Sequence, residues 1–186
     1  MQNQSQQNLQ DQIAKVQQQY YTDHSKNRFF KSSQKQDCAR QVCEQVDLTH
    51  MINMTYFNIP NTTYVYFNYA LFKTFATADI KDQLYIRFCS VIDEVIQKYN
   101  YFEMHCNLQG FTVSAAQRYY SFITSSIDDN QAFSDKMTKL VIYHSPSVIE
   151  QIVMLLRKSV SQFTNRAVFY SKNDSEVAIK KIFENL

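Results

Sequence analysis

The chain has 186 residues, a formal net charge of +2 and a hydrophobic content of 45%, which together predict one folded domain with a sizeable core. The net charge is small and no basic run is interleaved with aromatic residues, so nucleic acid is not expected as a partner. No window approaches about 18 consecutive apolar residues, so any contact with a membrane is expected to be peripheral.

Residues 1–36 form a glutamine-rich segment whose few apolar positions have helical spacing. Leu9, Ile13, Val16 and Tyr20 fall on one stripe of an amphipathic helix. A narrow stripe on a polar helix cannot fold alone, so it needs a surface on this domain or on another protein. We therefore expect a helical N-terminal extension that can dock a protein partner. An extension that merely has a biased composition is an equally good interpretation.

The four cysteines, at positions 38, 43, 89 and 106, include no CxxC pair and no spacing typical of a disulfide framework. This pattern predicts reduced, partly buried thiols. The first twenty residues also lack the apolar core of a signal peptide. Both observations favour an intracellular, reducing compartment, with the protein soluble or peripheral to a membrane of unspecified organelle.

Beyond residue 36, runs with helical periodicity alternate with short runs rich in β-branched and aromatic residues. Helix starts are expected at Asp37 and Asp79, and capping boxes at Ser114 with Gln117 and at Ser147 with Glu150. The predicted elements are helices at 37–52, 79–100, 114–127, 148–160 and 174–186, and strands at 62–75, 101–108, 139–144 and 167–170. Because strands and helices alternate from 62 to 186, the predicted fold class is α/β, with a mixed, mostly parallel sheet covered by helices.

The segment 101–118 organises this pattern, because it contains a strand, a turn and the start of a helix. Alternation places Phe102, Met104, Cys106 and Leu108 on one face of the strand and Glu103, His105 and Asn107 on the other. The turn contains Gly110, the only glycine in the chain. A sequence that keeps one glycine here predicts a backbone with positive φ or a close approach.

The sequence offers little support for catalysis. One glycine cannot build a GxGxxG or Walker loop, and no GxSxG elbow is present. We therefore expect no catalytic residue, no metal and no cofactor. The protein is not expected to be an enzyme. Two weaker alternatives remain open. Cys106 beside His105 or His144 is a conceivable thiol nucleophile, and Glu103 with both histidines is a conceivable zinc site.

The helix at 148–160 carries more apolar residues than one face requires: Val148, Ile149, Ile152, Val153, Leu155, Leu156 and Val160. Most such helices belong to a core. The alternative is a helix whose inner face packs against a removable hydrophobic ligand. Periodicity does not separate the two, because an acyl chain and a leucine side chain impose the same pattern.

Two blocks resemble the CRAL-TRIO domain of lipid-binding and phosphatidylinositol-transfer proteins. FEMHCNLQGFTVSAA at 102–116 is similar to that family's apolar strand, Asp-Leu-x-Gly and Ser/Thr-bearing turn. FSDKMTKLVIYHSPSVIEQIVMLLRKSV at 133–160 is similar to its Tyr-Pro-Glu-Arg, apolar strand, Asn-Ala-Pro and long apolar helix. The resemblance is strongest over 62–186 and defines a domain at 37–186.

The resemblance implies a lipid cavity whose floor is the sheet and whose gate is the helix at 148–160. It implies cavity positions at Phe102, Met104, Cys106, Ile149, Ile152, Val153 and Leu156. Asp135 matches the Glu of Tyr-Pro-Glu, and Arg166 matches a Lys before the last strand, so both are expected at the lipid head group. Phe102 and Met104 replace hydroxyl residues of phosphatidylcholine-exchanging members, so phosphatidylcholine is not the expected lipid.

Two functions therefore follow from the sequence. The first is non-enzymatic binding, and possible transfer, of a lipid or other hydrophobic ligand, with the membrane surface as a peripheral partner and bound lipid in place of a cofactor. The alternative is a structural or interaction subunit of a larger, membrane-associated assembly that keeps the CRAL-TRIO fold without lipid exchange.

Overall fold

The computed structural model describes the chain except for residues 1, 25–30, 129–130 and 185–186, and gives the backbone alone at 2–6, 31–32 and 131–132. Five strands form one sheet: β1 (Tyr56–Asn58), β2 (Tyr64–Asn68), β3 (Phe102–Asn107), β4 (Met137–Tyr143) and β5 (Ala167–Phe169). Their order in the sheet is that of the chain, with β1 antiparallel to β2 and every other pair parallel. The predicted α/β class and the mixed, mostly parallel sheet are confirmed.

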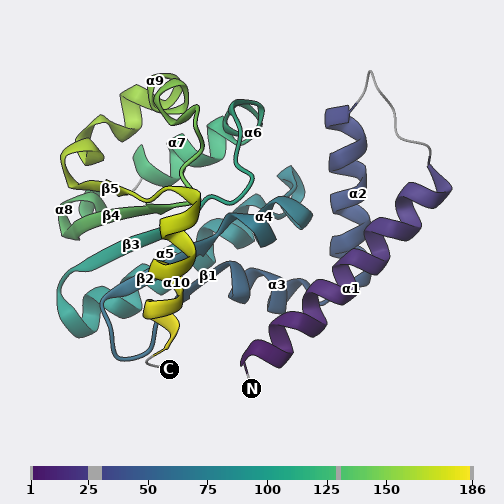
Figure 1. Cartoon of the computed structure of the whole chain (residues 1–186), viewed down its shortest axis with the longest axis horizontal. Helices are drawn as coiled ribbons and strands as arrows, with labels where there is room; N and C mark the ends of the chain where they lie inside the picture. Colours follow the sequence, from purple (N-terminus) through teal and green to yellow (C-terminus); the bar gives the residue numbers. More distant parts are fainter. Residues whose placement is uncertain (1, 25–30, 129–130, 185–186) are drawn as a thin grey trace.

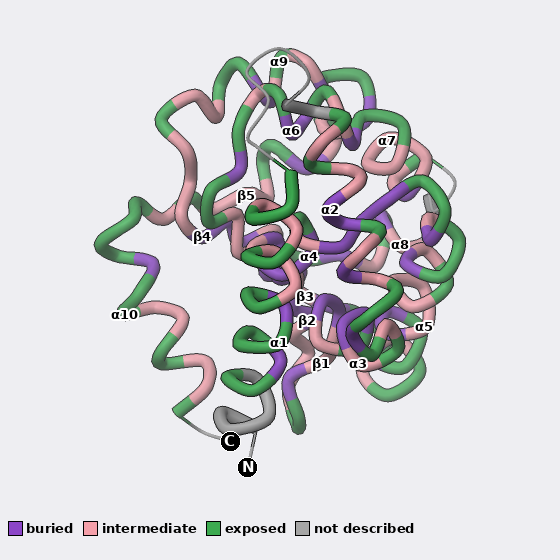
Figure 2. The backbone as a smooth tube through the Cα atoms, turned by 90° about the vertical axis from the view of Figure 1, so that its right-hand side faces the viewer, coloured by how far each residue is buried: buried purple, intermediate pink, exposed green. Residues whose placement is uncertain are grey.

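The helices lie in two unequal layers. Those that connect the parallel strands are α4 (Tyr69–Phe75), η1 (Ala78–Ile80), α5 (Lys81–Tyr99), α6 (Val113–Arg118), α7 (Tyr120–Asp128), α8 (Gln131–Lys136), α9 (Ile149–Val160) and η2 (Ser161–Arg166). Crossovers of one hand between strands in chain order place their helices on the same face of a sheet. Figure 2 shows α5, α7 and α8 on one side of the strands and α10 (Lys172–Phe183) on the other.

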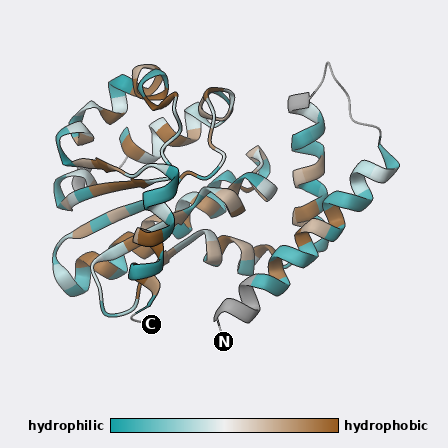
Figure 3. Cartoon of the chain, viewed as in Figure 1, coloured by the Kyte–Doolittle hydropathy of each residue, from teal (hydrophilic) through white to brown (hydrophobic). Residues whose placement is uncertain are grey.

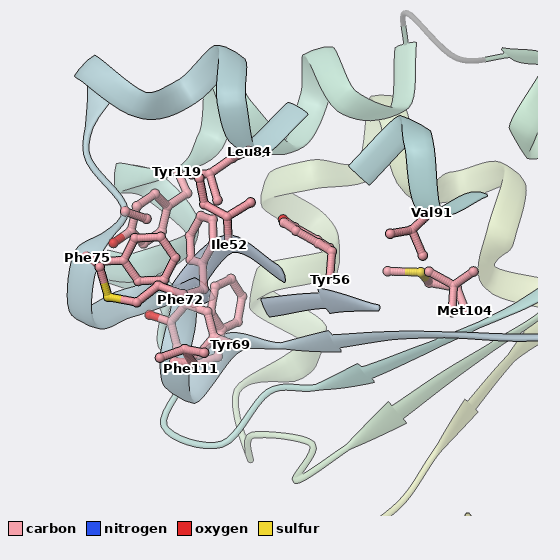
Figure 4. Close-up of a cluster of buried hydrophobic side chains, with 14 of the residues drawn as sticks. Ile52, Tyr56, Tyr69, Phe72, Phe75, Leu84, Val91, Met104, Phe111 and Tyr119 are labelled. Carbon is pink, nitrogen blue, oxygen red and sulfur yellow. The ribbon is translucent and has the colours of Figure 1, made fainter. Parts of the chain in front are cut away.

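The main core lies between the sheet and the connecting helices. Figure 4 shows Met104 of β3 beside Val91 of α5, with an aromatic group that includes Tyr69, Phe72 and Phe111 farther along. A second, smaller cluster lies on the α10 face of the sheet and is made of Ile59, Tyr66, Val141 and Tyr143. The sheet therefore has apolar contacts on both faces, as its β-branched and aromatic composition predicts.

The N-terminal part of the chain is a pair of packed helices, α1 (Gln2–Asp23) and α2 (Lys31–Gln45). Leu9 and Ile13 of the predicted stripe are only 3% and 4% exposed, and Val16 packs against the same core. The rest of α1 is largely hydrophilic, as Figure 3 shows. Three of the four stripe residues thus pack within this chain, and the fourth, Tyr20, is partly buried. Helix α2 runs across residue 36, where the sequence places the end of the N-terminal extension.

The prediction of a single helix at 37–52 is wrong, because the chain forms two helices there. Helix α2 begins before Asp37, which lies inside it and pairs with Arg40 at 3.0 Å. A second helix, α3 (Leu48–Thr55), begins after Asp47, whose carboxylate accepts a hydrogen bond from the backbone N–H of His50. An aspartate cap of this kind starts a helix by satisfying an amide of its first turn.

The strand predicted at 62–75 is right only for its first half. It ends at Asn68, whose side-chain oxygen accepts from the backbone N–H of Leu71 and caps α4. Tyr69, Phe72 and Phe75 are buried on one face of this helix, so tertiary packing decides a run whose composition favours strand. The break predicted at 56–60 contains β1, which pairs with β2.

Two predicted capping boxes are also wrong. Thr112 caps α6 by accepting from the backbone N–H of Ala115 at 3.2 Å, in place of Ser114. Val148 is the N-cap of α9 and makes no side-chain capping bond, in place of Ser147. The helix predicted at 114–127 is divided into α6 and α7, and α8 follows where no helix was expected.

The remaining elements agree with the sequence within a few residues. Helix α5 ends at Asn100, which has a left-handed backbone with φ of 67°. Gly110 has a φ of +78°, which agrees with the positive φ predicted for the only glycine in the chain. Among the helices described, none combines the length and the apolar character that a bilayer crossing requires.

Candidate functional site

An apolar cavity of about 270 Å³ lies between the sheet and the connecting helices. The seven residues predicted to line a cavity all line this one: Phe102, Met104, Cys106, Ile149, Ile152, Val153 and Leu156. They come from two elements, β3 and α9, that are more than forty residues apart in the chain. The structure therefore brings the predicted cavity residues together around one hollow.

The floor of the cavity is set by the alternation of β3. Phe102 and Met104 are buried, and Cys106 continues the same face. Met104 lies in register with Val65 of β2 and Leu140 of β4, so the floor extends over three strands. Burial raises the pKa of the Cys106 thiol to about 12, so this group is neutral at physiological pH and presents an apolar surface.

The roof of the cavity includes α9. Ile149, Ile152, Val153 and Leu156 recur at spacings of three, one and three, which places them on the inward face of the helix. The outward side carries Met154, which is 75% exposed, together with the exposed Arg157 and Lys158. The unusual breadth of apolar residues on α9 therefore has two parts, a face toward the cavity and one exposed methionine.

The other walls are mainly aromatic and come from α4, α5, α7, the C-cap of α6 and the first two strands. They include Tyr56, Phe67, Phe72, Phe88, Tyr119 and Phe122. The few polar side chains include Ser126, whose hydroxyl donates to the backbone carbonyl of Phe122 at 2.7 Å. A hollow whose walls offer so few polar partners is expected to stay dry, because a buried water needs two to four of them.

The two predicted head-group residues do not line the cavity. One guanidinium nitrogen of Arg166, Nη1, donates to the backbone carbonyls of Ser134 at 2.9 Å and Met137 at 2.8 Å. Ser134 lines the cavity and Arg166 does not, so Arg166 stabilises the wall through the backbone of Ser134. Asp135 is exposed on α8, next to Ser134 in the chain. Arg166 thus has a structural role that its match to a family motif did not indicate.

The weaker alternatives find little geometry to support them. In the described part of the chain, no group of three or more His, Cys, Asp or Glu side chains is arranged to hold a metal ion. All four cysteines are free thiols. The backbone N–H of His144 donates to the hydroxyl of Ser175 in α10 at 2.6 Å, which ties this residue to helix packing.

A second, more polar pocket of about 860 Å³ lies on the opposite face of the sheet, under α10. Glu103, His105 and Lys139 from β3 and β4 line it, and Asp174 and Lys181 from α10 close it. The alternation of β3 predicted that Glu103 and His105 share a face, but nothing in the sequence placed α10 over them. The signal is the run of polar residues at alternate positions in an otherwise apolar strand.

Comparison of the chain with protein-family models, with curated proteins and with solved structures found no match. The chemistry of the two pockets is therefore what bears on function. Burial holds the Cys106 thiol of the apolar cavity in its protonated form at neutral pH, and most of the other described side chains that line the cavity are apolar. Such a lining is suited to an apolar molecule.

Proposed function

We propose that the protein is a non-enzymatic binder of a hydrophobic ligand, held in the cavity between the sheet and α9. The observation that carries this proposal is an apolar hollow of about 270 Å³, lined by residues of the sheet and of the connecting helices. Protein interiors are packed as densely as organic crystals, so an unfilled apolar volume of this size needs a reason. An engineered apolar cavity of about 150 Å³ is already large enough to bind benzene.

The cavity volume limits the ligand to a small apolar molecule or one short acyl chain. A water-sized group occupies about 30 Å³, so the hollow holds about nine such groups. A methylene is similar in size, which makes a chain of about eight to ten carbons the best fit. A phospholipid with two long tails would require α9 to move outward.

Burial of the chain supplies the binding energy. Each methylene removed from water contributes about 0.8 kcal/mol, so nine contribute about 7 kcal/mol before the cost of losing translational freedom. After a cost of at least about 4 kcal/mol, the chain alone is expected to bind in the millimolar range, and contacts to a polar head are needed for micromolar affinity. Ligand specificity would come from length and shape, because the walls offer few hydrogen bonds.

The CRAL-TRIO resemblance belongs to this proposal, with the sheet as cavity floor and α9 as the movable gate. In support, the cavity residues that the resemblance implies line a single hollow. Exposed Met154 lies one turn from the exposed Arg157 and Lys158, so the outer side of α9 combines an apolar side chain with basic neighbours. We propose that this side approaches the membrane surface from which the ligand comes.

The head group is assigned to the region around Arg166 and Asp135 only as a second part of the proposal. Arg166 reaches the cavity wall through the carbonyl of Ser134, so an anionic head would lie at the edge of the cavity, near α8. A guanidinium has five N–H donors, and the two contacts described use one nitrogen.

The alternative, a structural subunit of a larger assembly, was motivated by an amphipathic N-terminal helix that needs a surface. Leu9 and Ile13 are buried within this chain, so that need is met without a partner. We therefore favour ligand binding. A protein partner on the described part of α1 would contact its hydrophilic side.

The first experiment is mass spectrometry of lipid extracted from the purified protein, together with native mass spectrometry of the intact complex. A stoichiometric hydrophobic species is the expected result. Protein free of any such species, and unable to take up a fluorescent medium-chain fatty acid, would contradict the proposal.

Three variants test whether the ligand binds in this cavity. Met104→Arg puts an unpaired charge on the cavity floor, which costs several kcal/mol and should abolish uptake. Met154→Arg makes the same substitution on the exposed side of α9 and should leave uptake into the soluble protein unchanged. Val153→Phe, which narrows the hollow without adding charge, distinguishes loss of cavity space from loss of folding. Uptake of the best-fitting chain that is as strong in Val153→Phe as in the wild type would move the ligand elsewhere.

A further inference from the structure

The pocket beneath α10 contains a buried polar side chain with an unused hydrogen-bonding group. His105 is 4% exposed and lines this pocket, and its Nε2 has no hydrogen-bond partner within the described chain. Buried polar groups in proteins are almost always paired, because an unpaired group loses its hydration without compensation. An unpaired group in a residue that forms the wall of a pocket of about 860 Å³ therefore points to something that binds in the pocket.

The hydrogen bond on the other side of the ring fixes which nitrogen carries the proton. His105 Nδ1 lies 2.8 Å from the hydroxyl of Tyr143, a phenol that is itself buried. Among the described residues, Nδ1 is the acceptor within reach of the Tyr143 proton. If Tyr143 donates to Nδ1, no buried phenol proton is left unpaired, and Nε2 must then carry the hydrogen of the neutral ring. Nε2–H is thus an unpaired donor in the wall of the pocket, and the surrounding side chains cover it in this structure.

The nearest acceptor to this donor is just out of reach. The carboxylate of Glu103 lies 3.8 Å from Nε2, which is too long for a direct hydrogen bond. A group that accepts from Nε2–H and also donates to the carboxylate completes the chain from Tyr143 to Glu103. A hydroxyl does both with one oxygen, whereas a carboxylate or an ammonium does only one.

Two lysines in the wall of the pocket favour a ligand that carries a negative charge. Lys139 of β4 and Lys181 of α10 line the same pocket, and neither has an ion pair or hydrogen bond with any described residue. Asp174, the acidic residue that α10 contributes, accepts a hydrogen bond from the hydroxyl of Ser171 at 2.6 Å and so is engaged locally. The lysines are therefore available to an anionic group on the ligand.

From this arrangement we infer that the pocket between the sheet and α10 is a second binding site, for a small hydroxylated anion. The Glu103 side chain, which is 24% exposed, turns outward to admit a ligand hydroxyl that bridges His105 Nε2–H and the Glu103 carboxylate. The phosphate or carboxylate group of the ligand meets Lys139 and Lys181. Tyr64, whose ring centre is 4.3 Å from that of His105, gives the apolar side of a compact polyol a flat surface. The site is on the opposite face of the sheet from the apolar cavity and is independent of it.

The test uses four probes with the purified full chain, by isothermal titration calorimetry and by NMR of the His105 ring. Glucose 6-phosphate and gluconate carry hydroxyls with a phosphate and a carboxylate, respectively. Glucose supplies hydroxyls alone, and inorganic phosphate supplies charge alone. One of the two hydroxylated anions is expected to bind at least about tenfold more tightly than glucose or phosphate and to shift the Nε2–H resonance.

Conservative variants locate the binding. Glu103→Gln and Lys181→Gln should each weaken the tighter probe by about tenfold, since each removes a charge from a contact. Lys180→Gln is the matched control, because Lys180 is its exposed neighbour on α10 and pairs with Glu184 outside the pocket. The inference is overturned if neither hydroxylated anion binds at millimolar concentration. It is also overturned if inorganic phosphate or glucose binds as tightly, or if Lys180→Gln weakens binding as much as Lys181→Gln.

Discussion

Met104 and His105 are adjacent residues of β3 that open into different pockets on opposite faces of the sheet. The strand thereby separates an apolar cavity under α9 from a polar pocket under α10. Because side chains alternate along a strand, one six-residue segment supplies the floor of both. A substitution at either residue is expected to affect one pocket and to leave the other intact.

Filling the apolar cavity tests whether it is hollow. Val153→Phe adds apolar volume at a residue that lines the cavity. We expect the free energy of unfolding to rise by about 0.5–1 kcal/mol, because the new ring gains contacts. In a solidly packed interior the same change would instead cost about 1–3 kcal/mol by overpacking. Chemical denaturation of the wild type and the variant measures the difference. Met154→Phe, on the exposed side of α9, is the control and should change stability little.

The pH dependence of stability should carry the signature of His105. Burial, and then the charge of Lys139, lower the pKa of His105 from 6.5 to about 4. The unfolded imidazole takes up a proton below pH 6.5, whereas the folded one does so only near pH 4. Stability is therefore full above pH 6.5 and falls by about 2–3 kcal/mol as the pH drops from 6.5 to 4.

The variant His105→Gln isolates this contribution, because glutamine does not titrate and keeps a polar group at the site. The charged and titratable groups around the ring, which remain in the variant, are Glu103, Lys139, Tyr143, Asp174 and Lys181. The difference in unfolding free energy between wild type and variant should shrink as the pH is lowered from 7 to 4.5. A difference independent of pH would show that His105 titrates normally.

Arg166 is predicted to contribute more by supporting the wall of the cavity than by attracting an anionic head group with its charge. Arg166→Ala leaves the carbonyls of Ser134 and Met137 without their charged donor, which should cost about 2–3 kcal/mol of stability. Arg157→Ala, an exposed change on α9, should cost less than about 0.5 kcal/mol. If Arg166 also meets a lipid head, binding of anionic ligands weakens more than that of neutral ones. Equal losses for both would remove the head-group role.

The glycine turn should be sensitive to conformation more than to size. Gly110 has φ of +78°, and a Cβ built there would lie 2.8 Å from the flexible Nζ end of Lys73, which can move. Gly110→Ala should therefore cost about 1 kcal/mol, mainly from the backbone. Gly110→Asn should cost less, because asparagine tolerates the left-handed region. A larger loss for Asn than for Ala, measured by thermal unfolding, would point to a steric cause instead.

The sequence could predict the elements in which local pattern and packing agree. The alternation of Phe102, Met104 and Cys106 and the helical spacing of Ile149, Ile152 and Leu156 follow from the faces that these residues bury, so these inward faces could be predicted from the sequence. The hollow between them could not, because a packed core and a ligand cavity impose the same pattern. The run 62–75 was predicted only in part, because its aromatic composition favours strand while the Asn68 cap and tertiary contacts select a helix for its second half.

The polar pocket depends on contacts that no local pattern contains. His105 and Tyr143 are 38 positions apart, and their hydrogen bond requires the register of β3 and β4 to be known. The position of α10 over Glu103 and Lys139 is likewise a property of the assembled fold. The role of Arg166 was missed for the same reason, since its acceptors are backbone carbonyls that carry no residue-specific signal.

The dependence of affinity on chain length tests the central claim most directly. Calorimetric titration with straight-chain fatty acids of six to sixteen carbons should show affinity rising about fourfold per methylene, because each buried group contributes about 0.8 kcal/mol. The rise should end near nine or ten carbons, where a hollow of about 270 Å³ is full. Absence of binding, or a rise that continues unbroken to sixteen carbons and persists in Val153→Phe, would contradict a ligand held in this cavity.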